Sequence, residues 1–206
     1  QNLYVGFEFV DNDVWGTDHT VGFDTAVNTA VRAIDQVRDT SESTGMMFYV
    51  EVMGRTSGAI ALHVALAAGA SGVFIPEARD EVEGIIARVR ASEARGKRSH
   101  IIVVAEGEEE GGAYAIAKQV AARFEHPYRV VVLGHIQRGG SPTALDRIVA
   151  AQSGAMAVEE LVAGRTGMMI GMRGGLPVAV PLSEVVANAH PGPRHDLIGL
   201  AHRISG

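Results

Sequence analysis

The 206-residue chain has no cysteine, no excess of basic charge and no long apolar run. Without cysteine it has no disulfide framework and no thiolate chemistry, and we expect a cytoplasmic protein. Its formal net charge of −6 does not favour a nucleic-acid partner. No apolar run approaches the roughly 20 residues that span a bilayer, and the first residues do not resemble a secretory signal, so we expect no membrane partner.

What the chain does have is abundant core-forming sequence, with 47% hydrophobic and 20% charged residues. Hydrophobic segments suited to strands alternate with segments of helical periodicity, and this alternation predicts an α/β fold. Its sheet should be mostly parallel and covered by helices on both faces. The expected strands are 5–10, 46–52, 73–76, 100–105, 128–133 and 166–172, and the expected helices are 20–38, 58–68, 82–89, 112–124, 141–162 and 196–204.

Three details of the connections are also predicted. Residues 39–45 are polar and are expected to form a loop, and Gly174 to Pro177 a turn. Ser141 and Pro142 are suited to the N-cap and first position of the long helix that follows, with Gly164 as its C-cap. His63, within an apolar helix, is expected to be a packing residue rather than a ligand.

Polar residues gather where the predicted strands end. These turns are Asp11-Asn12-Asp13, Met53-Gly54-Arg55, Glu106-Gly107 and the segment from His135 to Gly140. Because parallel strands place their carboxyl ends on one edge of a sheet, the four turns should meet there. Ligands of open α/β sheets bind at this edge, so the sequence predicts a binding site.

The residue types at this edge indicate an anion site. Arg129, His135 and Arg138 can hold a phosphate or another anion, because guanidinium groups bond phosphate oxygens bidentately. Glu106 and the backbone around Met53 can bond hydroxyl groups. The alternative interpretation of the Arg138 region is a polar strand end followed by a capped helix.

The remaining charges suit group transfer. Asp11 can take a proton from an alcohol, Asp13 can help to hold a divalent metal, and Arg55 can neutralise developing charge. Together these groups suit phosphoryl transfer to a sugar phosphate. The alternative interpretation of residues 11–13 is an Asx-rich turn.

On these residues the chain resembles the bacterial-type 6-phosphofructokinases. The resemblance runs from about residue 11 to 171, and more weakly to the end. The matching segments are Asp11-Asn12-Asp13, Gly16-Thr17-Asp18, residues 22–26, Glu51-Val52-Met53-Gly54-Arg55, Ala105-Glu106-Gly107 and residues 133–144.

The resemblance implies Mg²⁺-dependent phosphorylation of fructose 6-phosphate at its 1-hydroxyl, with ATP as co-substrate, by a homotetramer. By position in the family pattern, Asp11 resembles the catalytic base, Asp13 the magnesium-associated aspartate and Arg55 the arginine that stabilises the transferred group. The positions that hold the sugar are Met53, Gly54 and Glu106, and those that grip the 6-phosphate are Arg129, from a neighbouring subunit, His135 and Arg138.

The resemblance also implies a domain division. The chain, residues 1–206, is expected to be one α/β unit. About 14–138 would be the substrate domain, and about 1–13 and 139–190 part of the nucleotide domain. The chain covers the later two-thirds of the family pattern, without the glycine-rich nucleotide loops that precede Asp11 in the family.

Three positions depart from the family pattern. Phe9 replaces a substrate-contacting threonine, and Met46 replaces a second phosphate-binding arginine. Ser71 replaces an acidic residue of the effector site, where Arg95 and Lys97 match the basic positions. Sugar-phosphate binding is therefore expected more firmly than turnover.

Two other functions remain open. One is a pyrophosphate-dependent phosphofructokinase, although Glu8 lies near the position of its usual lysine. The other is a catalytically inactive fragment or subunit that binds sugar phosphate.

Overall fold

The computed structural model describes residues 10–78, 82–107, 111–188, 192 and 195–204. The predicted strand at 5–10 lies almost wholly outside these residues, as do Glu8 and Phe9, while Val10 lies in a turn. No helix in the described ranges is long and apolar enough to cross a membrane. The elements are α1 (Phe23–Thr44), β1 (Met47–Val52), α2 (Ala59–Ala67), β2 (Gly72–Phe74), α3 (Val82–Ala94), β3 (His100–Ala105), α4 (Gly112–Ala121), β4 (Tyr128–Val132), the 3₁₀ helix η1 (Gly134–Arg138), α5 (Ala144–Val162), β5 (Met168–Arg173), β6 (Leu176–Pro181), α6 (Leu182–Ala187) and α7 (His195–Ile204).

A parallel four-stranded sheet, ordered β2-β3-β1-β4, forms the centre of the larger lobe. β1 pairs with β3 from Met47 opposite His100 to Val52 opposite Ala105. On its other side β1 pairs with β4, which is an edge strand of the sheet. The carboxyl ends of β1, β3 and β4 therefore lie along one edge, as the sequence predicts.

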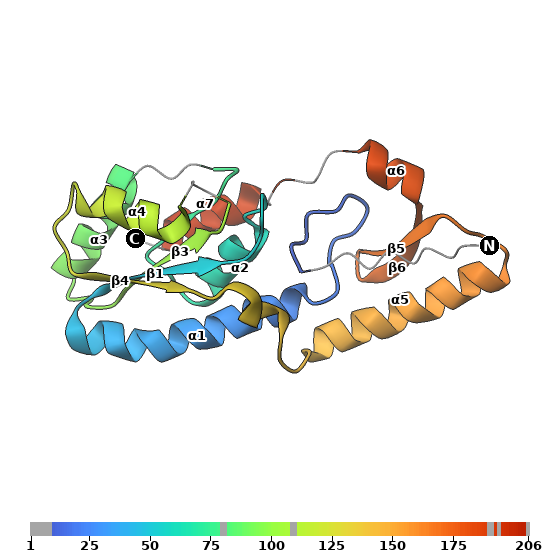
Figure 1. The fold of residues 1–206 in the computed structure, drawn as a ribbon, viewed down its shortest axis with the longest axis horizontal. Helices are drawn as coiled ribbons and strands as arrows, with labels where there is room; N and C mark the ends of the chain where they lie inside the picture. The colour runs from blue at the N-terminus through green and yellow to red at the C-terminus, as the bar shows by residue number, and fades with distance from the viewer. Residues whose placement is uncertain (1–9, 79–81, 108–110, 189–191, 193–194, 205–206) are drawn as a thin grey trace.

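Helices cover both faces of this sheet (Figure 1). Alternate residues of a strand point to opposite faces. Accordingly Phe48, Val50 and Val52 pack in a core with α1 and α2, while Met47 and Tyr49 pack in a second core with α3 and α4. The α7 helix returns to the first of these cores. The predicted α/β class, with a parallel sheet and helices on both faces, is confirmed.

A smaller lobe consists of α5, the β5–β6 hairpin and α6, and it extends from the larger lobe (Figure 1). The expected strand at 166–172 corresponds to β5, but the expected turn was too long. Gly174 and Gly175, with φ of 58° and 81°, form the two-residue turn, and Leu176 and Pro177 already belong to β6. Two successive positive φ angles give the tight turn that best suits an antiparallel hairpin.

The C-terminal end of α1 differs from the prediction. α1 continues through the expected loop to Thr44 and ends at Gly45, which has a φ of 68° and donates its backbone N–H to the Ser41 carbonyl. Within this last turn the hydroxyls of Ser43 and Thr44 donate to the Thr40 carbonyl.

The long helix α5 begins at Ala144, so Ser141 and Pro142 are not its cap. Thr143 is the N-cap, and its hydroxyl accepts a hydrogen bond from the Asp146 backbone N–H at 3.3 Å. At the other end Ala163 is the C-cap, and Gly164, which was expected there, follows it with a φ of 75°.

Candidate active site

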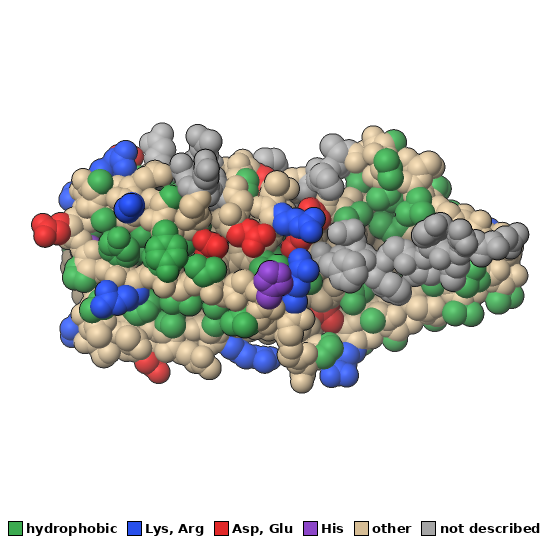
Figure 2. Space-filling model, viewed as in Figure 1, with side chains coloured by type: hydrophobic (Ala, Val, Ile, Leu, Met, Phe, Trp, Pro, Cys, Tyr) green, Lys and Arg blue, Asp and Glu red, His purple; other side chains and the backbone are tan. Residues whose placement is uncertain are grey.

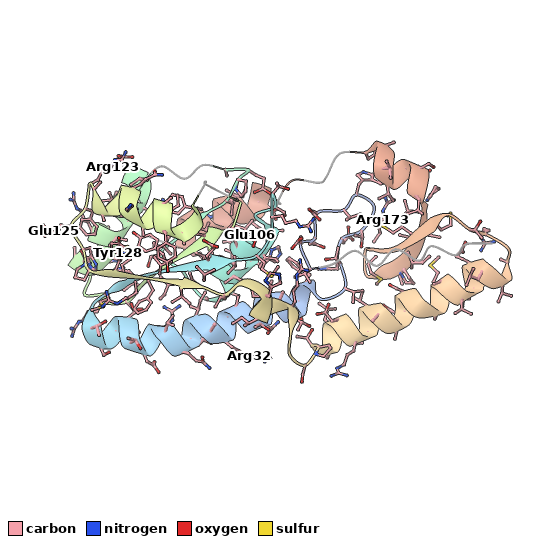
Figure 3. The ribbon with its side chains drawn as sticks, viewed as in Figure 1. Arg32, Glu106, Arg123, Glu125, Tyr128 and Arg173 are labelled. Atoms are coloured by element: carbon pink, nitrogen blue, oxygen red, sulfur yellow. The ribbon has the colours of Figure 1, made fainter. Side chains whose placement is uncertain are left out.

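The turns that follow β1 and β3 are joined by a carboxylate. Glu106 Oε1 accepts a hydrogen bond of 3.0 Å from the Arg55 backbone N–H. The Glu106 backbone N–H in turn donates to the Val52 carbonyl at 3.0 Å. A Cβ on Gly107 would overlap the Arg55 carbonyl oxygen, so the close approach of the two turns requires glycine. Figure 3 labels Glu106 near the middle of the molecule, where the two lobes meet.

The turn after β1 is also joined to η1, by the buried side chain of Gln137. Its Oε1 accepts from the Met53 backbone N–H at 2.8 Å, and its Nε2 donates to the Ala26 carbonyl at 3.4 Å. His135 and Arg138, in the same short helix, are exposed. Sequence reasoning assigned no role to Gln137, although it lies inside the motif that was recognised.

Asp11 lies among the charged residues of this edge. It interacts electrostatically with Asp13, Glu106, Arg138 and Arg55. Burial, followed by the Asp13 charge, raises the pKa of Asp11, and the two arginines oppose this rise. Its Oδ1 is buried and accepts no hydrogen bond from the described residues. An acceptor in this position is ready for a donor from a ligand.

The four predicted polar turns therefore lie together, as the sequence indicated. Figure 2 shows acidic, basic and histidine side chains side by side near the middle of the molecule. Two guanidinium groups and several carboxylates share a partly buried surface. Such a site can bind an anion and accept a proton beside it.

The side chain of Asn12 holds the loop that carries Asp11 together through bonds to residues further along the chain, rather than through a local Asx turn. Asn12, with φ of 54°, accepts from the Thr20 backbone N–H at 2.8 Å. The same loop is attached to the smaller lobe: Thr17 Oγ1 accepts from the Met172 N–H at 2.9 Å, and Asp18 Oδ2 from the Gly174 N–H at 2.7 Å.

Asp146, in the first turn of α5, is a buried carboxylate to which sequence reasoning assigned no role. It is 4% exposed and accepts from the backbone N–H groups of Gly22 at 2.9 Å and Thr25 at 2.8 Å. The Thr25 hydroxyl also donates to it. A carboxylate at a helix N-terminus is favoured by the helix dipole, so Asp146 fixes the start of α1 against α5. The acidic residue three positions after Thr143 was the available signal.

Comparison with known proteins identifies the family. The phosphofructokinase family model matches residues 8–161. The chain belongs to the phosphofructokinase family. Relatives include an ATP-dependent 6-phosphofructokinase 1 of Thermus thermophilus, 51% identical over 86% of this chain and 55% of the relative. An ATP-dependent 6-phosphofructokinase of Brevibacillus brevis is 48% identical over 88% of this chain and 56% of the relative. The chain thus spans about half the length of the curated relatives it matches.

Solved phosphofructokinase structures share the fold. Phosphofructokinase from Saccharomyces cerevisiae gives a TM-score of 0.82 at 32% identity, covering 95% of this chain and 26% of that one. A pyrophosphate-dependent phosphofructokinase from Marinobacter aquaeolei gives a TM-score of 0.77 at 27% identity, covering 97% of this chain and 59% of that one.

One residue expected in the phosphofructokinase site lies elsewhere in this chain. Arg129 is the second residue of β4, paired with Phe48, and its guanidinium donates to the Tyr128 carbonyl at 3.0 Å. Figure 3 labels Tyr128 toward the end of the sheet opposite Glu106. Within a single chain the fold therefore does not bring Arg129 together with His135 and Arg138. Met46 precedes β1 at the same distant end.

His63 makes the packing contacts that were expected of it. Its Nδ1 lies 2.8 Å from the Ala59 carbonyl oxygen, and its ring meets Phe23 edge to face at 4.9 Å. One side of the ring faces a cavity of about 720 Å³ between α2 and α5.

The described residues contain no cluster of three His, Asp or Glu side chains arranged to hold a metal. Mg²⁺ is nevertheless commonly held by one or two carboxylates together with substrate phosphates and water. Asp11 and Asp13, whose charges interact, fit such an arrangement.

A second basic cluster lies at the opposite edge of the sheet. Arg38, Lys97 and Arg98 line a cavity of about 400 Å³. Burial, followed by the charges of Arg38 and Arg95, lowers the pKa of Lys97. Lys97 Nζ donates to the Ser71 hydroxyl at 3.3 Å, so the position that departs from the family pattern is bonded to a basic position that matches it.

Proposed function

We propose that this chain supplies the sugar-phosphate site of a 6-phosphofructokinase that transfers a phosphoryl group from ATP to the 1-hydroxyl of fructose 6-phosphate. The observation that carries the proposal is Asp11. Its buried, unpartnered carboxylate oxygen lies among residues whose charges suit a phosphorylated sugar. The relatives named ATP-dependent 6-phosphofructokinase support ATP as the donor.

In the proposed reaction Asp11 is the base. Its carboxylate accepts the proton of the 1-hydroxyl as that oxygen forms a bond to the terminal phosphorus and the bond from phosphorus to the nucleotide oxygen breaks. Arg55 stabilises the charge on the transferred group. Mg²⁺, which Asp13 would help to hold, would neutralise phosphate charge.

The remaining site residues bind the substrate. His135 and Arg138 grip the 6-phosphate, and both are exposed and available for it. Glu106 uses one carboxylate oxygen for the Arg55 N–H, so the other is left for a sugar hydroxyl. The turn at Met53 and Gly54 forms the wall of the proposed sugar site next to Glu106. Holding the two reactants in this geometry supplies much of the rate enhancement of phosphoryl transfer.

We also propose the larger assembly that the family pattern implies. The segment 14–138 would be the substrate domain, and 139–190 with 1–13 part of the nucleotide domain. Arg129, exposed on an edge strand, supports donation to the phosphate site of a neighbouring subunit in a cytoplasmic homotetramer. The basic cluster around Lys97 would hold an anionic effector. Binding of that effector would make this glycolytic enzyme allosteric.

The test is the formation of fructose 1,6-bisphosphate by the purified chain given fructose 6-phosphate, Mg²⁺ and either ATP or pyrophosphate. Product with ATP alone would support the proposed donor and show that this chain suffices for turnover. Product with pyrophosphate alone would assign the other donor. Calorimetric binding of fructose 6-phosphate without product from either donor would identify an inactive sugar-phosphate-binding unit, and absence of binding would overturn the proposed function.

A further inference from the structure

Gln137 differs from its neighbours in η1. His135 and Arg138 are exposed, whereas Gln137 is 1% exposed and points into the protein. A buried amide is costly unless both of its ends are hydrogen-bonded. The residue is therefore held in place by specific contacts rather than by apolar packing.

Both ends of the Gln137 amide bond to backbone groups of other elements. The oxygen accepts from Met53 N–H, just after β1, and the nitrogen donates to the Ala26 carbonyl in α1. Gln137 lies 84 residues from Met53 and 111 from Ala26 along the chain. One side chain thus sets the relative positions of η1, α1 and the turn after β1.

The turn after β1 has a conformation that needs such support. Arg55 has a φ of 50°, which is uncommon for a residue with a side chain, and Gly54 has a φ of 151°. Such conformations persist where surrounding contacts determine them. Gln137 holds the start of the turn at Met53, and Glu106 holds it at Arg55.

We propose that Gln137 is a positioning residue, which fixes the spacing between the turn that contacts the sugar and the η1 segment that binds its 6-phosphate. This inference rests on the proposed function, because that function assigns the two contacts. A sugar phosphate must reach both segments at once, so its affinity depends on their spacing. Inorganic phosphate needs the η1 segment alone, and its affinity does not.

The experiment compares Gln137→Met, which removes both hydrogen bonds at similar length, with Gln137→Glu, which keeps the acceptor for Met53. Ser41→Ala is the matched control. Ser41 is a fully buried polar residue at the opposite edge of the sheet, where its hydroxyl donates to the Met46 carbonyl and accepts from the His100 N–H. Each folded protein is titrated with fructose 6-phosphate by calorimetry and with inorganic phosphate by NMR.

We expect Gln137→Met to weaken fructose 6-phosphate binding about 10-fold and phosphate binding less than about 2-fold. Gln137→Glu should also weaken fructose 6-phosphate binding more than phosphate binding, because its second carboxylate oxygen would face the Ala26 carbonyl, and Ser41→Ala should change neither affinity. Equal losses for both ligands, or unchanged fructose 6-phosphate affinity, would overturn the positioning role. Failure of the unmodified chain to bind the sugar phosphate would instead overturn the proposed function.

A measurement without ligand tests the same role separately. Amide hydrogen exchange at Met53 and Arg55 should be faster in both Gln137→Met and, to a smaller extent, Gln137→Glu than in Ser41→Ala. Unchanged exchange at these two amides in Gln137→Met would contradict the inference even if no sugar phosphate binds. If Gln137→Met does not fold, the exchange rates of Gln137→Glu decide the matter in the same way.

Discussion

The two edges of the parallel sheet carry different chemistry. At the carboxyl edge, charged side chains face one another and are held by backbone hydrogen bonds, as Glu106 is by Arg55. At the amino edge, His100 is 1% exposed, and neither of its ring nitrogens has a hydrogen bond from the described residues. Glu93 is 3.8 Å from one of those nitrogens.

Burial disfavours the charged form of the titratable groups at both edges, so it shifts the pKa of the acid and the pKa of the bases in opposite directions. It raises the pKa of Asp11 and lowers the pKa of His100 and of Lys97. At the carboxyl edge Arg138 and Arg55 oppose the effect on the acid. At the amino edge Lys97 and His126 add to the effect on His100, and Glu93 opposes it. At both edges an opposite charge thus counteracts the effect of burial; the edges differ in which group is buried, an acid beside two arginines or a histidine beside one glutamate.

The largest expected effect is at Asp11. Asp11→Ser should lower turnover by about 1000-fold or more, because the proton acceptor is lost. Fructose 6-phosphate affinity should stay within several-fold, since the phosphate contacts remain. Steady-state kinetics and calorimetry measure the two quantities. Normal turnover with a large loss of affinity would contradict the assigned role.

The second-largest expected effect is that of Arg138→Ala. It should weaken fructose 6-phosphate binding by roughly 2–4 kcal/mol if the charge pair with the phosphate is desolvated. It should also raise the pKa of Asp11 further, because one opposing charge is removed. The control is Arg123→Ala, whose arginine pairs with Glu83 at 3.0 Å on the surface. Equal affinity in the two variants would remove Arg138 from the site.

A third pair of variants compares the two ends of α1. Asp146→Ala should lower the free energy of unfolding by about 2–3 kcal/mol, because it removes the cap of the α1 N-terminus. Ser41→Ala, at the C-terminal end, should cost only about 1 kcal/mol. Urea denaturation measures both. A larger loss for Ser41→Ala would reverse the comparison.

The smallest effect concerns pH. A histidine whose pKa is lowered by folding binds protons more readily in the unfolded chain. Above its unfolded pKa of about 6.5, His100 is neutral in the folded and the unfolded chain and does not lower the free energy of unfolding. As pH drops through that value toward the lower folded pKa, the free energy of unfolding should fall. His100→Met should flatten this part of the pH profile, whereas His19→Asn, at an exposed position, should leave it unchanged. An unchanged slope in His100→Met would exclude His100 as its cause.

The sequence could predict the sheet because its strands are continuous hydrophobic runs. It could predict the convergence of the polar turns because parallel strands align their carboxyl ends. It could not predict the partners of Gln137, which lie 84 and 111 residues away, or those of Asp146, which lie 121 and 124 residues away. Nor did local composition reveal that β6 follows β5 after only two glycines, since glycine and proline together indicate a longer turn.

The loop that carries Asp11 has a mechanical consequence. Thr17 and Asp18 attach this loop to the β5–β6 hairpin, whereas Gln137 attaches the η1 segment to the larger lobe. Val10, immediately before Asp11, packs in the core of the larger lobe, so the proposed proton acceptor lies between the two attachments. The proposed phosphate contact at Arg138 belongs to the larger lobe alone. A rotation between the lobes would therefore strain the segment from Val10 to Asp18.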